Sequence, residues 1–260
     1  MQDKVMAKGK WEFNEEVTGV FDNMLERSIP DYNNMRYLVK KLSYEFMKNT
    51  ELPSNTIIDI GSSRGRALKD IYKKDSKYNY IGIEISKPMY ESCVNEWKDN
   101  NNINFYNYDL KNYFPKLSRP DNILTLSILT LCFVPIEYRL FVLNNIYKSL
   151  SIGGGLIVVE KCLPNNFETS SYFDNVYYNM KKENNYSQEE INAKRKSLEG
   201  ILVPLTNSFN EELFKSAGFK KIDIFWKTLN FTGWVLIKWK GSYMPEPSHT
   251  PCPMCGVSDE

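Results

Sequence analysis

Residues 59–66, with the sequence Asp-Ile-Gly-Ser-Ser-Arg-Gly-Arg, limit what this chain can fold into more than its other segments do. They end the β-branched run 56–60 and lead into a segment with helical periodicity, so the pattern predicts a strand, a tight turn and a helix. Glycine in such a turn lets the backbone approach a ligand closely, at the edge where open parallel sheets bind ligands. The sequence therefore predicts an α/β fold with a ligand at the carboxyl end of this strand.

Strands and helices alternate along the chain on this interpretation. The strands are expected at 56–60, 78–85, 103–106, 122–130 and 155–160, with helices at 66–74, from 86 onward and at 136–150. Apolar strands that alternate with helices predict a parallel sheet covered on both faces. A helix capped by Asn210 and two closely joined strands, 219–226 and 231–239, are expected to close the domain, the two strands running antiparallel.

The chain is expected to have four parts. They are an N-terminal helical cover, a ligand-binding domain, a helical lid inserted into that domain, and a tail rich in proline and cysteine: residues 1–52, 53–240, 163–205 and 241–260. Amphipathic helices are predicted at 14–29 and 34–49 in the cover. In the lid, helices are predicted at 170–182 and 187–200, the second opening with a capping box at Ser187.

Carboxylates follow two more strands at the same edge of the sheet. Glu84 ends the second strand, and Asp109 follows the third. The carboxylate of Glu84 can accept hydrogen bonds from both hydroxyl groups of a ribose, and that of Asp109 can accept one from an adenine amino group. Asp59 is then free to face an amino group. Together the three acids predict an adenosine site.

A nicotinamide dinucleotide site is the main alternative. That fingerprint requires Gly-x-Gly-x-x-Gly, and its three glycine positions are occupied here by Gly61, Ser63 and Arg66. The pattern therefore fails at two positions. A glycine-rich turn without a ligand is the other alternative.

Composition excludes several classes of protein. The chain has 33 Lys and Arg against 32 Asp and Glu, a net charge of +1, so nucleic acid is not an expected partner. The longest nearly apolar run, 123–134, is shorter than the ~20 residues of a membrane-spanning helix, and the N-terminus lacks the apolar core of a signal peptide. Five cysteines, an odd number, do not suit a disulfide framework. A cytoplasmic protein without membrane association is expected.

The sequence resembles the class I S-adenosylmethionine (SAM) dependent methyltransferases in the loop 59–65, in Glu84 and Asp109, and in the closing antiparallel strand. Further segments sharpen the resemblance to the carboxy-SAM synthase group: 9–17, 20–24, 27–32, 182–187 and 190–195. The resemblance covers about 9–240. It implies a Rossmann-like fold with a mostly parallel seven-stranded sheet, an antiparallel last strand, an N-terminal helical cover and a helical lid.

The resemblance also implies a reaction. Carboxy-SAM synthases take SAM and prephenate, and a SAM ylide captures the carbon dioxide that prephenate loses. It implies that Tyr32 and Arg195 reach the sulfonium end of the cofactor and that Arg195 holds the new carboxylate. The expected contacts with SAM or carboxy-SAM are Tyr32, Asp59, Gly61, Ser62, Ser63, Gly65, Glu84, Ile85, Asp109, Leu110, Ser127 and Ile128.

The chain departs from the group's pattern near the fourth strand. Where the group usually has an Asn on the substrate side, this chain has Ile128, next to Ser127; in the loop, Arg64 replaces an apolar residue and Ser62 a Cys. Keeping the cofactor contacts while losing a polar substrate-side group is expected of a chain whose second substrate has changed. A conventional small-molecule methyltransferase, or another SAM-consuming enzyme, is therefore an alternative to carboxy-SAM synthesis. A non-catalytic SAM-binding scaffold is the third hypothesis.

The second substrate is expected to be a small molecule, and an anion if Arg195 points inward. The Asn/Asp-Pro-Pro-Tyr signature of methyltransferases that act on nucleic-acid amines is absent. Because the single histidine lies in the tail, a general base inside the fold would be Tyr32, Tyr186 or a carboxylate. Arg195, Tyr32 and Tyr186 are the catalytic candidates. The aromatic lid segment 172–178 is the expected surface of a homodimer.

The tail contains a zinc-like pattern. His249, Cys252 and Cys255 are the types of ligand that suit a tetrahedral zinc site. A structural site needs four ligands, so Asp259 or a second chain would have to complete it. A proline-rich tail without metal is the alternative, and it is the preferred one.

Overall fold

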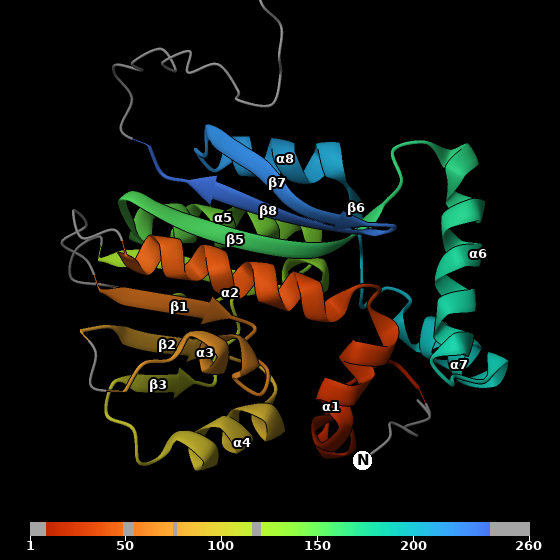
Figure 1. Cartoon of the computed structure of the whole chain (residues 1–260), viewed down its shortest axis with the longest axis horizontal. Helices are drawn as coiled ribbons and strands as arrows, with labels where there is room; N and C mark the ends of the chain where they lie inside the picture. The colour runs from red at the N-terminus through yellow and green to blue at the C-terminus, as the bar shows by residue number, and fades with distance from the viewer. Residues whose placement is uncertain (1–8, 49–54, 75–76, 116–120, 240–260) are drawn as a thin grey trace, which may run out of the picture.

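The computed structural model of the chain describes residues 9–48, 55–74, 77–115 and 121–239. Its main strands are β1 Thr56–Ile60, β2 Asn79–Ile83, β3 Ile103–Tyr106, β4 Asn122–Ile128, β5 Leu150–Leu163, β7 Lys221–Thr228 and β8 Phe231–Ile237. They lie in the order β3-β2-β1-β4-β5-β8-β7, and β8 runs antiparallel to both of its neighbours (Figure 1). The predicted Rossmann-like sheet is confirmed. A two-residue strand, β6 (Leu205–Thr206), adds to it by pairing with β5.

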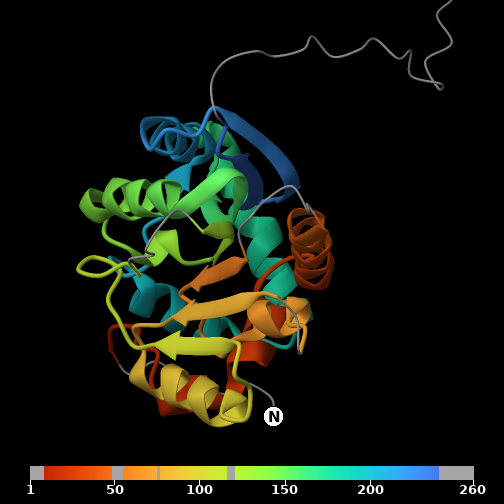
Figure 2. The same ribbon diagram turned by 90° about the vertical axis from the view of Figure 1, so that its left-hand side faces the viewer.

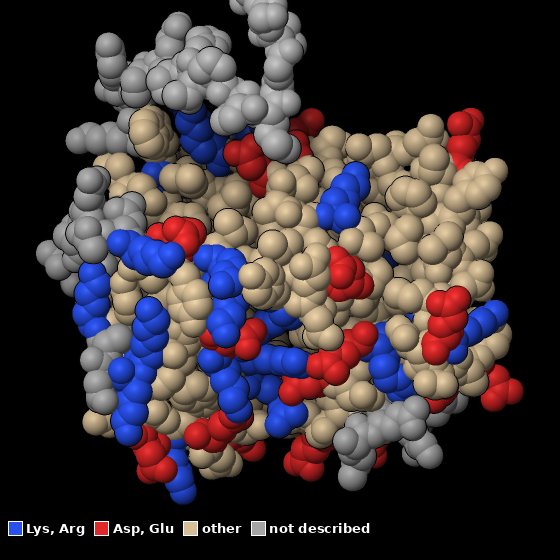
Figure 3. Space-filling view, viewed as in Figure 1, with Lys and Arg blue, Asp and Glu red and all other residues tan. Residues whose placement is uncertain are grey.

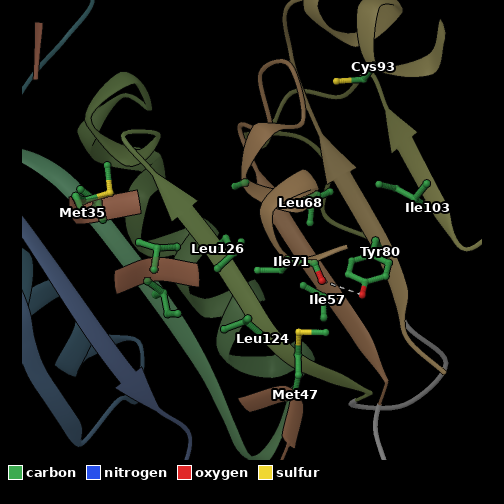
Figure 4. Packing of buried hydrophobic residues seen from close by; sticks show 14 of the residues in the cluster. Met35, Met47, Ile57, Leu68, Ile71, Tyr80, Cys93, Ile103, Leu124 and Leu126 are labelled. Atoms are coloured by element: carbon green, nitrogen blue, oxygen red, sulfur yellow. Dashed lines mark hydrogen bonds between the residues drawn. The ribbon is translucent and has the colours of Figure 1, made fainter. Parts of the chain in front are cut away.

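Helices cover both faces of the sheet (Figure 2). One face carries α2 Tyr32–Lys48, α3 Arg66–Ile71 and α4 Lys87–Trp97, and the other carries α5 Ile136–Ser149 and α8 Asn207–Ser216. Side chains of β1 alternate between the two layers: Ile57 belongs to the core under α2 and α3, and Ile58 to the core under α5 and α8. In the first core the Tyr80 hydroxyl donates to the Ile71 carbonyl oxygen over 3.3 Å (Figure 4).

Three further helices, α1 Glu15–Ser28, α6 Phe167–Glu183 and α7 Gln188–Leu198, stand at the side to which the parallel strands point (Figure 1). The guanidinium of Arg27 in α1 donates to the carbonyl oxygens of Asn184 and Asn185, each over 2.8 Å, and so joins α1 to the turn between α6 and α7. The three helices therefore form a connected cover over the carboxyl edge of the sheet. Within the described ranges, no helix combines the length and the apolar character needed to cross a membrane.

Most predicted helix starts are confirmed. The Asn14 side chain accepts from the Val17 amide over 3.1 Å at the start of α1, and Ser86 caps α4. The capping box of α7 is complete, because Ser187 and Glu190 each accept from the other's backbone amide. Each of these caps depends on residues three positions apart, which is why the capping box at Ser187 could be predicted from spacing alone.

The prediction that Asn210 caps a helix is wrong. The cap of α8 is Thr206, whose hydroxyl accepts from the Phe209 amide over 3.2 Å. Thr206 ends β6 and therefore already has the extended backbone conformation that a cap requires. Asn210 lies one turn inside the helix, where its side-chain Nδ2 donates to the Thr206 carbonyl oxygen over 3.2 Å.

The packing of α2 on the sheet requires Gly155 in β5. A Cβ at Gly155 would lie 2.2 Å from the Phe46 ring and 3.0 Å from the Leu236 carbonyl oxygen. We expect Gly155→Ala to lower the free energy of unfolding by about 1–3 kcal/mol, because the crowded core has to shift. Urea unfolding measures this change.

Gly19→Ala is the matched control. Gly19 lies in α1, and a Cβ there would have no atom within 4 Å. Alanine should stabilise this helix by about 0.5–1 kcal/mol, since glycine loses more backbone entropy on folding. Equal stability of Gly155→Ala and the wild type would contradict the packing of α2 on β5.

Candidate functional site

A cavity of about 420 Å³ lies at the carboxyl edge of the sheet, under the connected cover of α1, α6 and α7. Its wall includes a group of the residues that the sequence predicts: Tyr32, Asp59, Gly61, Ser62, Ser63, Glu84, Ile85, Ile128 and Arg195. They come from the N-terminal cover, from the ends of β1, β2 and β4, and from the lid. The fold therefore brings cofactor and catalytic candidates together from distant parts of the chain.

The loop after β1 turns through backbone conformations that favour glycine. Gly61 has φ +63°, and a Cβ there would lie 2.4 Å from Thr130 Oγ1. The Thr130 hydroxyl donates to the Ile60 carbonyl oxygen over 2.9 Å, which ties the loop to the end of β4. Gly65 has φ +69°, and a Cβ there would lie 3.1 Å from the Phe105 ring. Gly61 thus lines the cavity, whereas Gly65 shapes the turn into α3.

Glu84 is held in one orientation by two backbone donors. Its Oε2 accepts from the Ser63 amide and its Oε1 from the Ser86 amide, each over 2.7 Å. Burial raises the pKa of Glu84, and the backbone donors partly offset this effect. A carboxylate fixed in this way keeps lone pairs for hydroxyl groups of a ligand.

Asp59 is buried at the cavity, and its Oδ2 has no hydrogen-bond partner among the described residues. The pKa of Asp59 is raised to about 8, mainly by burial and also by Glu84, while Arg36 acts to lower it. Nearby, Ser62 Oγ and Ser127 Oγ are also buried without a partner in the part of the chain that the structure describes. Buried polar atoms are seldom left unpaired, so this edge suits a ligand that supplies hydrogen bonds and a positive charge.

The other predicted residues lie outside the cavity wall: Gly65, Asp109, Leu110, Ser127 and Tyr186. Asp109 turns back into its own loop, where it accepts from the Lys111 amide over 2.9 Å and pairs with the Lys111 ammonium over 3.3 Å. The Tyr186 hydroxyl accepts from Ser28 Oγ over 3.3 Å. Because Ser28 lines the cavity, Tyr186 lies one layer behind its wall.

Two parts of the wall were not predicted. The N-terminal cover contributes an apolar group, Trp11, Phe13, Phe21 and Met24. The end of β5 and the lid contribute Lys161, Tyr177 and Tyr178. Trp11 and Phe13 lie in the segment 9–17 that carries the family resemblance, which does not by itself place them at a cavity. The others lie in or next to predicted helices and strands, a pattern that describes an ordinary core equally well.

The zinc candidates His249, Cys252 and Cys255 lie outside the described residues, as does Asp259. Within the described ranges, no group of three or more His, Cys, Asp or Glu side chains is placed to hold a metal ion. The cysteines at 93, 132 and 162 are buried and free.

Comparison with known proteins agrees with this geometry. Residues 53–130 match the model of a family described as "Putative methyltransferase". The structure of the plantazolicin methyltransferase BpumL, in complex with a monoazolic desmethylPZN analog and SAH, has a TM-score of 0.61 to this chain at 17% identity. The match covers 85% of this chain and 90% of that chain, and it shows the shared fold. The protein is a SAM-dependent transferase with the class I methyltransferase fold.

Similarity to curated proteins identifies the family within this class. The chain is 34% identical to the carboxy-S-adenosyl-L-methionine synthase of Nautilia profundicola, over 92% of this chain and 100% of the relative. It is also 34% identical to the enzyme of that name from Staphylococcus epidermidis, over 88% of this chain and 97% of the relative. The chain belongs to the carboxy-S-adenosyl-L-methionine synthase family.

The raised pKa of Asp59 predicts how stability depends on pH without ligand. In the folded protein this carboxyl holds its proton up to about pH 8, whereas the unfolded chain loses it near 3.8. The folded state therefore binds more protons between these values, and the Asp59 contribution to stability falls as the pH rises. We expect Asp59→Asn to exceed the wild type in stability by a margin that grows up to about pH 8. The growth is at most about 1.4 kcal/mol per pH unit.

Urea unfolding at several pH values between 5 and 8 measures this margin. Asp223→Asn is the control, because Asp223 is an exposed carboxyl in β7 and its replacement should change stability little. Since both variants keep every other titrating group, those groups cancel in the comparison with the wild type. An Asp59→Asn margin that does not change with pH would contradict the buried, protonated carboxyl.

Proposed function

We propose that the protein makes carboxy-SAM from SAM and prephenate. Prephenate loses carbon dioxide and its ring hydroxyl group and becomes phenylpyruvate. The released hydroxide takes a proton from the S-methyl group of SAM and leaves as water, and the carbon of the resulting ylide forms a bond to the carbon dioxide. The observation that carries the proposal is Arg195 in the wall of the same cavity as Asp59 and Glu84. A planar guanidinium matches a carboxylate with two hydrogen bonds and stays charged when desolvated. Ordinary methyl transfer places no carboxylate on the cofactor and needs no such group.

The sheet edge suits the cofactor. Glu84 accepts from the ribose hydroxyls with a carboxylate already oriented by two backbone donors. Asp59 pairs with the amino group of the methionine part, which supplies the missing partner of Oδ2 and favours the ionised carboxylate. Ile85, 61% exposed at the cavity, offers apolar contact to the adenine ring. Asp109 reaches the adenine amino group only if it gives up its ion pair with Lys111.

Tyr32 acts in this proposal as a hydrogen-bond donor. It is buried at the start of α2, and burial raises its pKa above the ordinary value of 10.0. The phenol is therefore protonated at neutral pH and does not take the proton from the S-methyl group. Tyr32 instead helps to fix the sulfonium end of the cofactor near Arg195.

A conventional methyl transfer to a small molecule is the second candidate. Ile128 favours it, because this apolar residue lines the cavity where the carboxy-SAM synthase group usually has an Asn on the substrate side. The hydroxyl of the adjacent Ser127 is buried and does not line the cavity. The two reactions share the cofactor contacts and differ in product, which is carboxy-SAM in one case and the demethylated cofactor in the other.

We further propose a cytoplasmic homodimer that forms through the lid. On α6, Phe167, Tyr172 and Val176 are 92%, 71% and 53% exposed, and apolar side chains grouped on one helix often mark an interface.

Lys and Arg are interspersed with Asp and Glu on the face shown in Figure 3, which does not suit a phosphate backbone. A small molecule is therefore the proposed second substrate.

Removing either acid at the sheet edge should weaken the binding of the cofactor. We expect Asp59→Ala and Glu84→Ala each to lower the affinity for SAM by about 1–3 kcal/mol, because hydrogen bonds to a charged group are lost. Titration calorimetry with SAM measures the change. Glu45→Ala is the control, since this carboxylate on α2 is 69% exposed and lies away from the cavity. Wild-type affinity in both acid variants would refute the cofactor site.

Removing the arginine should separate binding from turnover. We expect Arg195→Ala to bind SAM normally and to lose turnover with prephenate, because the new carboxylate has no anchor. Mass spectrometry detects the product of the wild type as a nucleoside heavier than SAM by one carbon dioxide. Lys196→Ala, the next cation on α7, should keep full turnover. Persistent turnover in Arg195→Ala would exclude the anchor, and demethylated cofactor from the wild type would favour methyl transfer.

A further inference from the structure

Lys161 lies in the cavity wall but has no role in the cofactor contacts. It is near the end of β5, where it pairs with Phe231 of β8, and it lines the cavity together with Tyr178 and Arg195. The adjacent carboxylate of Glu160 does not neutralise it. Successive side chains of a strand point to opposite faces, and Glu160 accepts from the backbone amides of residues 131 and 132 over 2.9 and 2.6 Å.

The ammonium of Lys161 has no counter-ion within the described ranges. It forms no ion pair or hydrogen bond there, and it lies 4.9 Å from the centroid of the Tyr177 ring. Burial lowers the pKa of Lys161, an effect that Asp174 opposes. The carboxylate of Asp174 instead accepts from Asn230 Nδ2 over 3.2 Å.

Two other cations of the wall are paired with acids. Arg36 pairs with Asp70, and Arg66 pairs with Glu26 over 2.9 Å. Such pairs offset the cost of removing a charge from water, whereas Lys161 has only the Tyr177 ring and the more distant charge of Asp174 to offset it. Lys161 is therefore a half-buried cation at a ligand cavity without an ion-paired carboxylate among the described residues.

We infer that Lys161 binds a carboxylate that the second substrate keeps throughout the reaction. The inference rests on the proposed function, in which Arg195 holds the carboxylate that forms on the cofactor. Lys161 approaches the cavity from the sheet and Arg195 from α7, so the two cations can hold separate anionic groups. Tyr177 and Tyr178 border the same part of the wall and offer an apolar surface to an unsaturated carbon skeleton. Lys161 is thus a specificity residue for a carboxylic acid.

Lys161→Met tests this role, because methionine keeps the apolar stem and removes the charge. Lys182→Met is the matched control, since Lys182 is an exposed lysine of α6 outside the cavity wall. Two measurements are made on each protein: the steady-state KM for prephenate, and the calorimetric affinity of prephenate for the protein loaded with S-adenosylhomocysteine, which has no methyl group to react.

We expect Lys161→Met to raise the KM for prephenate and to weaken its binding by about tenfold or more, since a charge-assisted contact is lost. The affinity for SAM should stay within about twofold of the wild type, and Lys161→Arg should recover part of the prephenate binding. Lys182→Met should match the wild type in both measurements.

The outcomes separate this inference from the proposed reaction. Unchanged KM and affinity for prephenate in Lys161→Met would overturn the carboxylate role even if carboxy-SAM is formed. An equal loss of SAM affinity would show a general structural effect and would overturn it too. If prephenate binds in a manner that depends on Lys161 but the wild type makes no carboxy-SAM, the proposed reaction fails and the subsite stands.

Discussion

The two backbone hydrogen bonds to the Glu84 carboxylate connect the parts of the fold on which the site depends. One donor, the Ser63 amide, belongs to the loop after β1, and the other, the Ser86 amide, precedes α4. Ser63 has φ 51°, a conformation that is costly for a residue other than glycine. The bond to Glu84 holds it there. The carboxylate thus fixes the loop, and the loop fixes the direction of the carboxylate.

The charged residues to which the proposed function gives a role come from different elements of the fold. Asp59 and Glu84 come from the ends of β1 and β2, whereas Lys161 and Arg195 come from β5 and α7. In a partly desolvated cavity charges act more strongly than in water. Under the proposed function, the acids attract the amino and hydroxyl groups of the cofactor and the cations attract an acidic second substrate. On this proposal, complementary charge contributes to the placement of the two reactants around the sulfonium.

Local signals in the sequence predicted the sheet edge because they act over a few residues. Strand β1 spans Thr56–Ile60, as expected, and the acids Asp59 and Glu84 line the cavity because strand ends in a parallel sheet share one edge. Asp109 also follows a strand that ends at this edge, but its side chain does not line the cavity. Lys111, two residues further on, pairs with it and draws the carboxylate away from the cavity wall. The order of strands and helices could be predicted from the sequence, whereas the ion pair that Asp109 forms with Lys111 could not.

The unpredicted part of the site depends on contacts between distant segments. In the sequence alone, Lys161 is a polar residue at the end of an apolar strand, which usually means a solvent-exposed position. Its burial arises because Tyr177 of the lid and Phe231 of β8 lie beside it in the folded protein. The proposed cofactor residues Asp59 and Glu84, in contrast, belong to the α/β core that this chain shares with other methyltransferases. The lid therefore contributes to the burial of a strand-end lysine, and under the proposed function the choice of second substrate depends on elements outside the core that holds the cofactor.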